Sequence, residues 1–134
     1  MILNIQSIKD PGDIEKERIV LSAQHSGDIG NSLIAVSKKR DENSISAKLE
    51  KIYWIPNQVV KENDLVVIYT KSGKRNLLNN NDGSTTYFFY WGLDSCIDRE
   101  NYALVLFDAQ WTYKLLGHNE SESTKSEIEE DNKE

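Results

Sequence analysis

The chain has 134 residues, of which 38% are hydrophobic, 9% aromatic and 28% charged, and its formal net charge is −6. This composition is typical of one globular domain with a sizeable core, and it excludes a disulfide scaffold, a collagen-like chain and a long coiled coil. No apolar run approaches the ~20 residues of a membrane span, and the N-terminal residues do not resemble a signal peptide. The single cysteine, Cys96, cannot form an internal disulfide, so a reducing, cytoplasmic location is expected.

The negative charge is concentrated at the C-terminal end. Residues 118–134 contain seven acidic residues and two lysines, whereas residues 1–117 contain 14 basic and 15 acidic residues. The last 17 residues hold one aliphatic side chain, Ile128, and cannot bury enough surface to offset the entropy of ordering. We predict a folded domain at residues 1–117 and a disordered acidic tail at residues 118–134, with a docking segment for a basic partner as the alternative for the tail.

In the first half of the chain, apolar and polar residues alternate with a period of two, which predicts strands. The first predicted strand lies at residues 3–7 and ends at a Pro-Gly turn. Further strands are predicted at residues 17–25, 31–37 and 46–55, with a charged loop at residues 38–44. Residues 65–70 are β-branched and aromatic with almost nothing polar, which predicts a central strand covered on both faces.

In the second half, residues 71–83 form the longest polar loop of the predicted domain. Strands are predicted after it at residues 84–91, 102–107 and 111–116. About eight short strands at roughly 10–15-residue spacing, with no convincing amphipathic helix, predict an all-β sandwich or barrel.

The sequence offers few groups for catalysis or metal binding. Cys96 has no second cysteine and no neighbouring histidine, so we interpret it as a partly buried structural thiol rather than a nucleophile. His25 and His118 are the only histidines, and two histidines with one cysteine cannot form a four-ligand Cys/His zinc site. We therefore expect no enzymatic activity, no catalytic residues, no cofactor and no metal site.

The most distinctive feature is the aromatic run Tyr87-Phe88-Phe89-Tyr90-Trp91. In a strand, Tyr87, Phe89 and Trp91 point to one face, whereas Phe88 and Tyr90 point to the other. One face is predicted to serve the core, and the second is covered either by a loop or by a protein partner. We choose the Phe88/Tyr90 face as the interaction face, because the hydroxyl of Tyr90 tolerates a wet rim.

For Trp54 and Trp111 the two alternatives are again packing within the domain and contact with a partner. Each lies near the end of a predicted strand, where an indole can pack the rim of a sandwich or cap an interface. The candidate interaction residues are therefore Phe88, Tyr90, Trp54 and Trp111.

Several segments resemble the lamin-tail domain family. Residues 53–70 are similar to its aromatic-x-x-proline stretch and the leucine-valine-valine strand that follows, although the turn at residues 61–64 lacks the family's glycine. Trp91-Gly92-Leu93 and residues 101–108 resemble its late elements, and residues 28–33 stand in the place of an earlier turn. The resemblance covers residues 17–113 and implies an immunoglobulin-like β-sandwich that serves as an interaction or anchoring module without enzymatic activity.

From these features we expect a non-catalytic protein-interaction module, a small accessory or scaffold subunit that binds a protein partner or forms a homo-oligomer. One alternative is a nucleic-acid-associated module, because lamin-tail-like domains also occur beside DNA-processing domains. The near-neutral charge of residues 1–117 disfavours this alternative, since duplex binding depends on many contacts between basic residues and phosphates. Another alternative is a binder of carbohydrate or another small ligand that uses exposed aromatic side chains.

Overall fold

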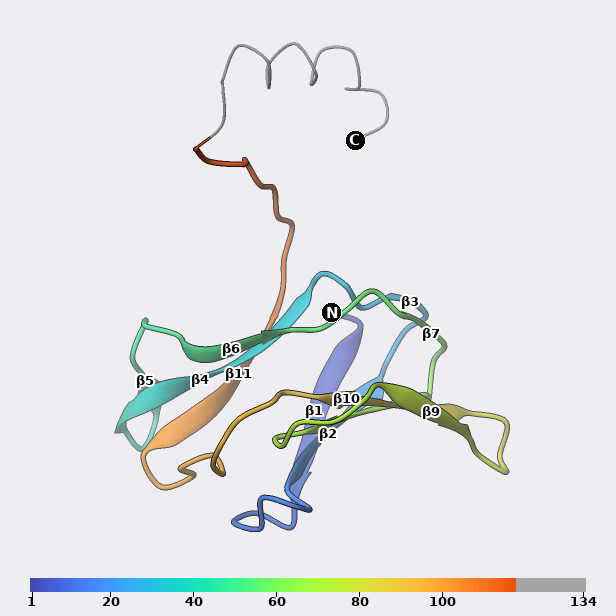
Figure 1. Ribbon diagram of the computed structural model, residues 1–134, viewed down its shortest axis with the longest axis horizontal. Coiled ribbons are helices and arrows are strands. Elements are labelled where there is room, and N and C mark those ends of the chain that lie inside the picture. The colour runs from blue at the N-terminus through green and yellow to red at the C-terminus, as the bar shows by residue number, and fades with distance from the viewer. Residues whose placement is uncertain (118–134) are drawn as a thin grey trace.

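The computed structural model describes residues 1–117, and every regular element within them is a β-strand. The predicted all-β sandwich is confirmed, whereas the predicted tail at residues 118–134 lies outside the described residues. The strands, shown in Figure 1, are β1 (Leu3–Lys9), β2 (Arg18–Ala23), β3 (Gly27–Asp28), β4 (Ser32–Asp41), β5 (Ser44–Ile45), β6 (Glu50–Trp54), β7 (Val59–Val60), β8 (Leu65–Tyr69), β9 (Asn76–Asn79), β10 (Thr85–Tyr90) and β11 (Tyr102–Asp108).

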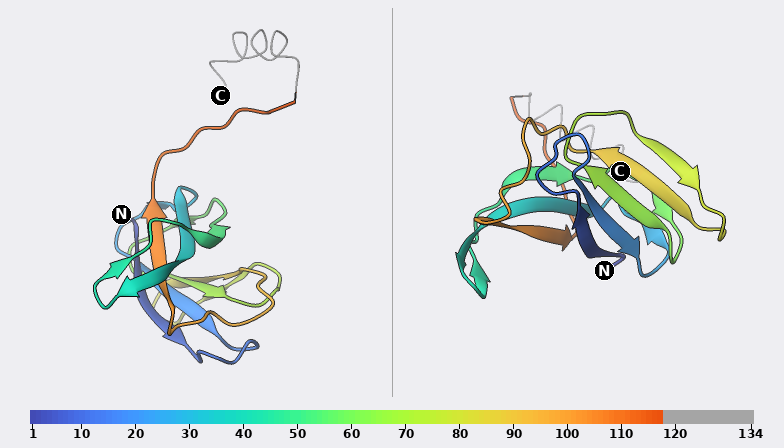
Figure 2. Two further views of the ribbon diagram at one scale, coloured as in Figure 1. Left: turned by 90° about the vertical axis from the view of Figure 1, so that its left-hand side faces the viewer. Right: turned by 90° about the horizontal axis from the view of Figure 1, so that it is seen from below.

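Two sheets form the layers of the sandwich (Figure 2). The five-stranded sheet has the order β1-β2-β8-β10-β9, and the second sheet has the order β11-β4-β5, with β6 also paired to β4. A short ribbon joins β3 to β7. Within the five-stranded sheet β10 is parallel to β8, whereas the other neighbouring strands are antiparallel.

The hydrophobic core lies between the two sheets. The exposed fractions of Phe89 and Ile68 are 1% and 0%, and Tyr87 and Trp91 pack against the same cluster, which confirms the predicted core face of the aromatic run. Each fully buried side chain of this size contributes about 1.5–3 kcal/mol. The buried members of the cluster are Leu3, Ile19, Leu21, Ala23, Ile29, Ile34, Val36, Ile55, Val60, Val66, Ile68, Phe89 and Ile97.

β8 is central, as predicted, and a buried aspartate fixes the point where it begins. The Asp64 carboxylate accepts the backbone N–H of Lys61 at 2.8 Å and that of Thr85 at 2.9 Å. The same group therefore closes the turn before β8 and holds the first residue of β10 beside it. Asn63 has a φ of 79°, so an asparagine takes the left-handed conformation for which a glycine is the usual choice.

A buried glutamate holds the other end of β8. The carboxylate of Glu17 accepts the backbone N–H groups of Gly12 at 3.0 Å and Ile97 at 3.1 Å. Its backbone carbonyl accepts the N–H of Thr70 at 3.2 Å, directly after β8. Buried polar groups are stable only when they are hydrogen-bonded, and here the bonds join three loops that are far apart in the sequence.

Residues 70–75 cross the end of β10, because parallel neighbours cannot be joined by a tight hairpin. The carbonyl of Lys71 accepts the N–H of Gly92 at 3.2 Å, which holds the crossing segment to the chain that leaves β10. A Cβ at Gly73 would lie 2.3 Å from a ring carbon of Tyr90. Glycine therefore allows the crossing segment to lie directly on the tyrosine ring.

Several predicted boundaries are wrong. The loop predicted at residues 38–44 is the end of β4 and the start of β5, because residues 39–41 pair with β5 in a hairpin. The strand predicted at residues 46–55 is reduced to β6, in which Lys51 has a φ of 49°. The loop predicted at residues 71–83 contains β9, whose Leu77 and Leu78 pair with β10.

Substituting the two neighbouring residues Val67 and Ile68 tests the two faces of β8. Val67 is 6% exposed but lies on the outer face, opposite Val20 and Phe88, whereas Ile68 points into the core. We expect Ile68→Asp to unfold the protein, because an unpaired charge in the core costs several kcal/mol of a total near 5–15 kcal/mol. Val67→Asp is expected to lower the stability less than Ile68→Asp, because Val67 lies on the outer face and outside the core cluster.

Urea unfolding followed by circular dichroism measures both variants. A folded Ile68→Asp protein beside an unfolded Val67→Asp protein would mean that the inner and outer faces of β8 are reversed.

Candidate protein-interaction surface

The candidate surface is built on the turn between β3 and β4. The carboxylate of Asp28 accepts the N–H groups of Gly30 at 2.8 Å and Gln58 at 3.1 Å, which ties this turn to the segment before β7. A Cβ at Gly30 would lie 1.8 Å from Oδ1 of Asn57, so a larger residue here would displace the Asn57 side chain. The turn then offers the carbonyl of Gly30 and the side chain of Asn31 as acceptors.

Trp54 and Trp111 meet on this turn. The indole N–H of Trp54, at the end of β6, donates to the carbonyl of Gly30 at 2.7 Å. The indole N–H of Trp111 donates to Oδ1 of Asn31 at 3.1 Å. The rings pack edge to face with centroids 4.7 Å apart, yet Trp54 is 49% exposed and Trp111 53% exposed. Their polar edges are therefore satisfied while much of their apolar surface faces solvent.

Trp111 belongs to an arm, residues 109–117, that runs away from the body after β11 (Figure 1). The N–H of Ala109 donates to the carbonyl of Asn31 at 3.1 Å, the last backbone hydrogen bond between residues of the described part of the chain. The Tyr113 ring centroid lies 6.4 Å from that of Trp111, and Tyr113 is 69% exposed. We call Trp54, Trp111 and Tyr113 the aromatic ridge.

The strand predicted at residues 111–116 is wrong as a description of this arm. The alternation of apolar and polar residues is that of a strand, but a strand also needs a neighbouring strand to pair with. The arm leaves the sheet at Asp108, and within residues 1–117 it has no strand beside it.

Phe88 and Tyr90 lie on the outer face of the five-stranded sheet, where they are half-buried. Tyr69 stacks on Tyr90 with ring centroids 5.3 Å apart and lies 6.4 Å from Phe88. The cationic groups of Lys71 and Arg18 lie 5.4 Å and 5.9 Å from the ring centroid of Tyr69. The outer face therefore carries three aromatic rings flanked by two cations.

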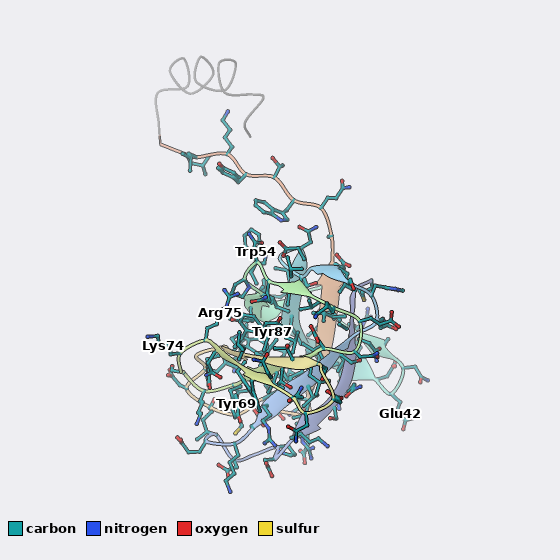
Figure 3. All side chains as sticks on the ribbon, turned by 90° about the vertical axis from the view of Figure 1, so that its right-hand side faces the viewer. Glu42, Trp54, Tyr69, Lys74, Arg75 and Tyr87 are labelled. Carbon is teal, nitrogen blue, oxygen red and sulfur yellow. The ribbon has the colours of Figure 1, made fainter. Side chains whose placement is uncertain are left out.

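The four predicted interaction residues thus belong to two separate surfaces. Trp54 lies next to the point where the arm leaves the body, whereas Tyr69, which stacks on Tyr90, lies on another part of the molecule (Figure 3). Sequence reasoning missed Tyr69, Asn31 and Tyr113 as members of these surfaces. The period-two apolar pattern at residues 111–116 was the available signal for Tyr113, whereas no local pattern pointed to Asn31.

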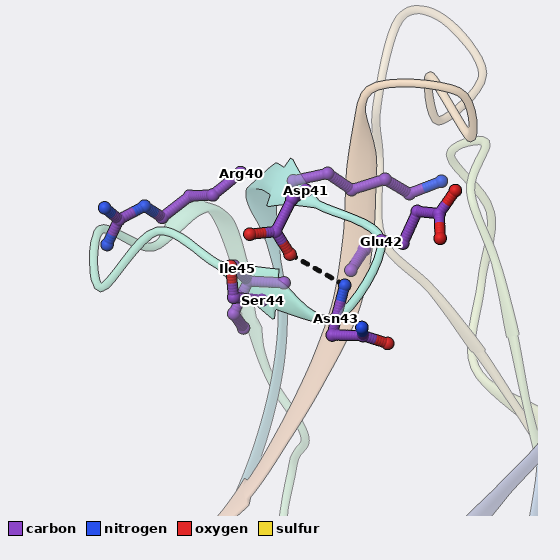
Figure 4. A pocket seen from close by; sticks show the side chains of 8 residues that line it. Arg40, Asp41, Glu42, Asn43, Ser44 and Ile45 are labelled. Carbon is purple, nitrogen blue, oxygen red and sulfur yellow. Dashed lines mark hydrogen bonds between the residues drawn. The ribbon is translucent and has the colours of Figure 1, made fainter.

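A shallow hollow of about 790 Å³ lies on the hairpin between β4 and β5 (Figure 4). The Asp41 carboxylate accepts the N–H of Asn43 at 2.8 Å, and this bond, with those from Ser44, lowers the pKa of Asp41. Two cationic and two carboxylate side chains balance one another around the hollow, so it does not favour an anion. The lining residues are Lys39, Arg40, Asp41, Glu42, Asn43, Ser44, Ile45 and Ala103.

The described residues offer little for catalysis. Cys96 is a half-buried free thiol, and burial together with the nearby carboxylate of Glu17 raises its pKa, which disfavours the nucleophilic thiolate. In residues 1–117 no three His, Cys, Asp or Glu side chains are grouped as metal ligands. The same part of the chain contains no helix long and apolar enough to span a membrane.

Comparisons with protein-family models, with curated proteins and with solved structures found no match to this chain. The resemblance to lamin-tail domains therefore stays a prediction.

The double change Phe88→Ser with Tyr90→Ser tests the outer aromatic face. If this face binds a partner, we expect the free energy of unfolding to fall by only about 1–2 kcal/mol, because the rings lie at the surface, while self-association or partner capture weakens. Urea unfolding and sedimentation measure the two effects, with Ile45→Ser as a control at an exposed apolar residue on β5. A protein that unfolds would show that both faces of β10 are structural.

Proposed function

We propose that this chain is a non-catalytic protein-interaction module and that the aromatic ridge is its contact surface. The observation that carries the proposal is the contiguous exposure of Trp54, Trp111 and Tyr113, each about half exposed or more. Monomeric proteins rarely expose contiguous apolar patches beyond a few hundred Å². Tryptophan and tyrosine are also the residue types that most often dominate the binding energy of protein interfaces.

The ridge is held in place before any partner arrives. Both indole N–H groups are hydrogen-bonded to the turn between β3 and β4, and the two rings support each other edge to face. Side chains that are already fixed lose little conformational entropy on binding. This preorganisation supports a binding role for the ridge rather than incidental exposure.

The alternative functions have less support. The β4–β5 hairpin carries the basic run Lys38-Lys39-Arg40. Carboxylates around the hollow offset this positive charge, which weakens the attraction for the phosphates of a nucleic acid. A sugar site needs convergent polar groups beside an aromatic ring. At the ridge, the carbonyl of Gly30 and the amide oxygen of Asn31 already accept the indole N–H groups. We therefore favour a protein partner, with the chain acting as an accessory or scaffold subunit.

The double change Trp54→Ser with Trp111→Ser tests this function by quantitative affinity capture from a lysate of the source cells. We expect a partner retained by the wild type to fall by about tenfold or more in the double variant, because tryptophan hot spots contribute at least ~1.4 kcal/mol each. The matched control is Ile45→Ser, which removes a similarly exposed apolar side chain from β5. Equal recovery by the wild type and the double variant, with both folded, would contradict the proposal.

A further inference from the structure

The arm has the pattern of a strand with one apolar face. Trp111, Tyr113 and Leu115 alternate with Thr112 and Lys114. The arm follows β11 directly, and β11 has β4 as its strand neighbour at the edge of the described sheet. Extended backbone that continues an edge strand can pair with another chain.

The arm is complementary to itself in an antiparallel register centred on Tyr113. When two arms pair about a two-fold axis at Tyr113, each Trp111 lies opposite Leu115 of the other copy and the two Tyr113 side chains lie opposite each other. Aromatic–aromatic and aromatic–aliphatic cross-strand pairs are stabilising. A register centred on Lys114 would place two like charges opposite each other, which is destabilising.

The exposed apolar area of the ridge and the arm is of the size that a small dimer interface buries. Since a whole aromatic side chain offers roughly 150–250 Å², the exposed parts of the aromatic ridge present on the order of 350 Å². Leu115, on the same side of the arm, is 69% exposed and extends this area. Specific interfaces bury about 600–800 Å² per partner, so the ridge, Leu115 and the arm backbone together approach the lower end of this range.

We propose that the aromatic ridge binds a second copy of this chain, through antiparallel pairing of the two arms about a two-fold axis at Tyr113. This inference rests on the proposed interaction function and names the partner. Closed two-fold dimers are the commonest homo-oligomers, and in them both copies use the same patch. A small interface of this kind gives a reversible dimer that dissociates on dilution.

Sedimentation of the full chain from about 1 µM to about 500 µM tests the dimer. The wild type is expected to shift from monomer to dimer across this range. Tyr113→Asp is expected to remain monomeric throughout, because two carboxylates would face each other on the axis. Thr112→Ser is the matched control, since it changes the opposite side of the arm, and it is expected to behave like the wild type.

Disulfide cross-linking tests the register itself. In a Cys96→Ser background, the Tyr113→Cys substitution places two thiols at Cα positions about 4.5–5.5 Å apart across the axis, within disulfide reach. The Thr112→Cys substitution places them about 8 Å apart, beyond that reach. Under mild oxidation the first variant is expected to form a covalent dimer at least about tenfold faster than the second.

The outcomes separate this inference from the proposed function. A wild type that stays monomeric at every concentration, or equal cross-linking of the two variants, overturns the second copy as the partner. If the wild type stays monomeric but captures a protein that the Trp54→Ser, Trp111→Ser double variant does not, the interaction function stands with a different partner. If the wild type stays monomeric and the double tryptophan variant captures the same proteins, both the dimer and the proposed interaction function are contradicted.

Discussion

The parallel pairing of β8 with β10 is the constraint on which the five-stranded sheet depends. Parallel neighbours need a crossover, so residues 70–75 must pass over the end of β10 before β9 can pair with its far edge. Gly73 makes this passage sterically feasible against the ring of Tyr90. At the two ends of β8, the buried carboxylates of Asp64 and Glu17 each bind one nearby and one distant backbone N–H group, and the bond from Thr85 to Asp64 holds the start of β10 beside β8.

The second sheet has a different role, because its edge leads to the exposed surface. β11 pairs with β4, and the chain then leaves the sheet at the turn that holds both indoles. The turn itself is held by the carboxylate of Asp28, and the Asn57 side chain packs against Gly30. The same local interactions that close this end of the sandwich therefore hold Trp54 and Trp111 at the surface, where a partner can reach them.

Local patterns in the sequence predict much of the fold. The apolar run of β8 identifies a central strand, and the alternation in Tyr87–Trp91 assigns Phe89 to the core, because both signals depend on a strand's own two faces. Pairing partners are not local, so the sequence does not predict β9 or the true length of β4. The sequence names Trp54 and Trp111 as candidates from their places near strand ends, but their meeting depends on Gly30 and Asn31, which are 24 and 80 residues away from them.

Hydrogen exchange of the backbone amides in the arm, measured at low and high protein concentration, tests most directly whether this segment is the interaction strand. We expect the amides of residues 111–115 to exchange rapidly in dilute protein and to become protected as the concentration rises, while the protection of β8 stays constant. Rapid exchange in the arm at every concentration would contradict pairing between two copies. Strong protection in dilute protein would show that the arm is already covered within a single chain.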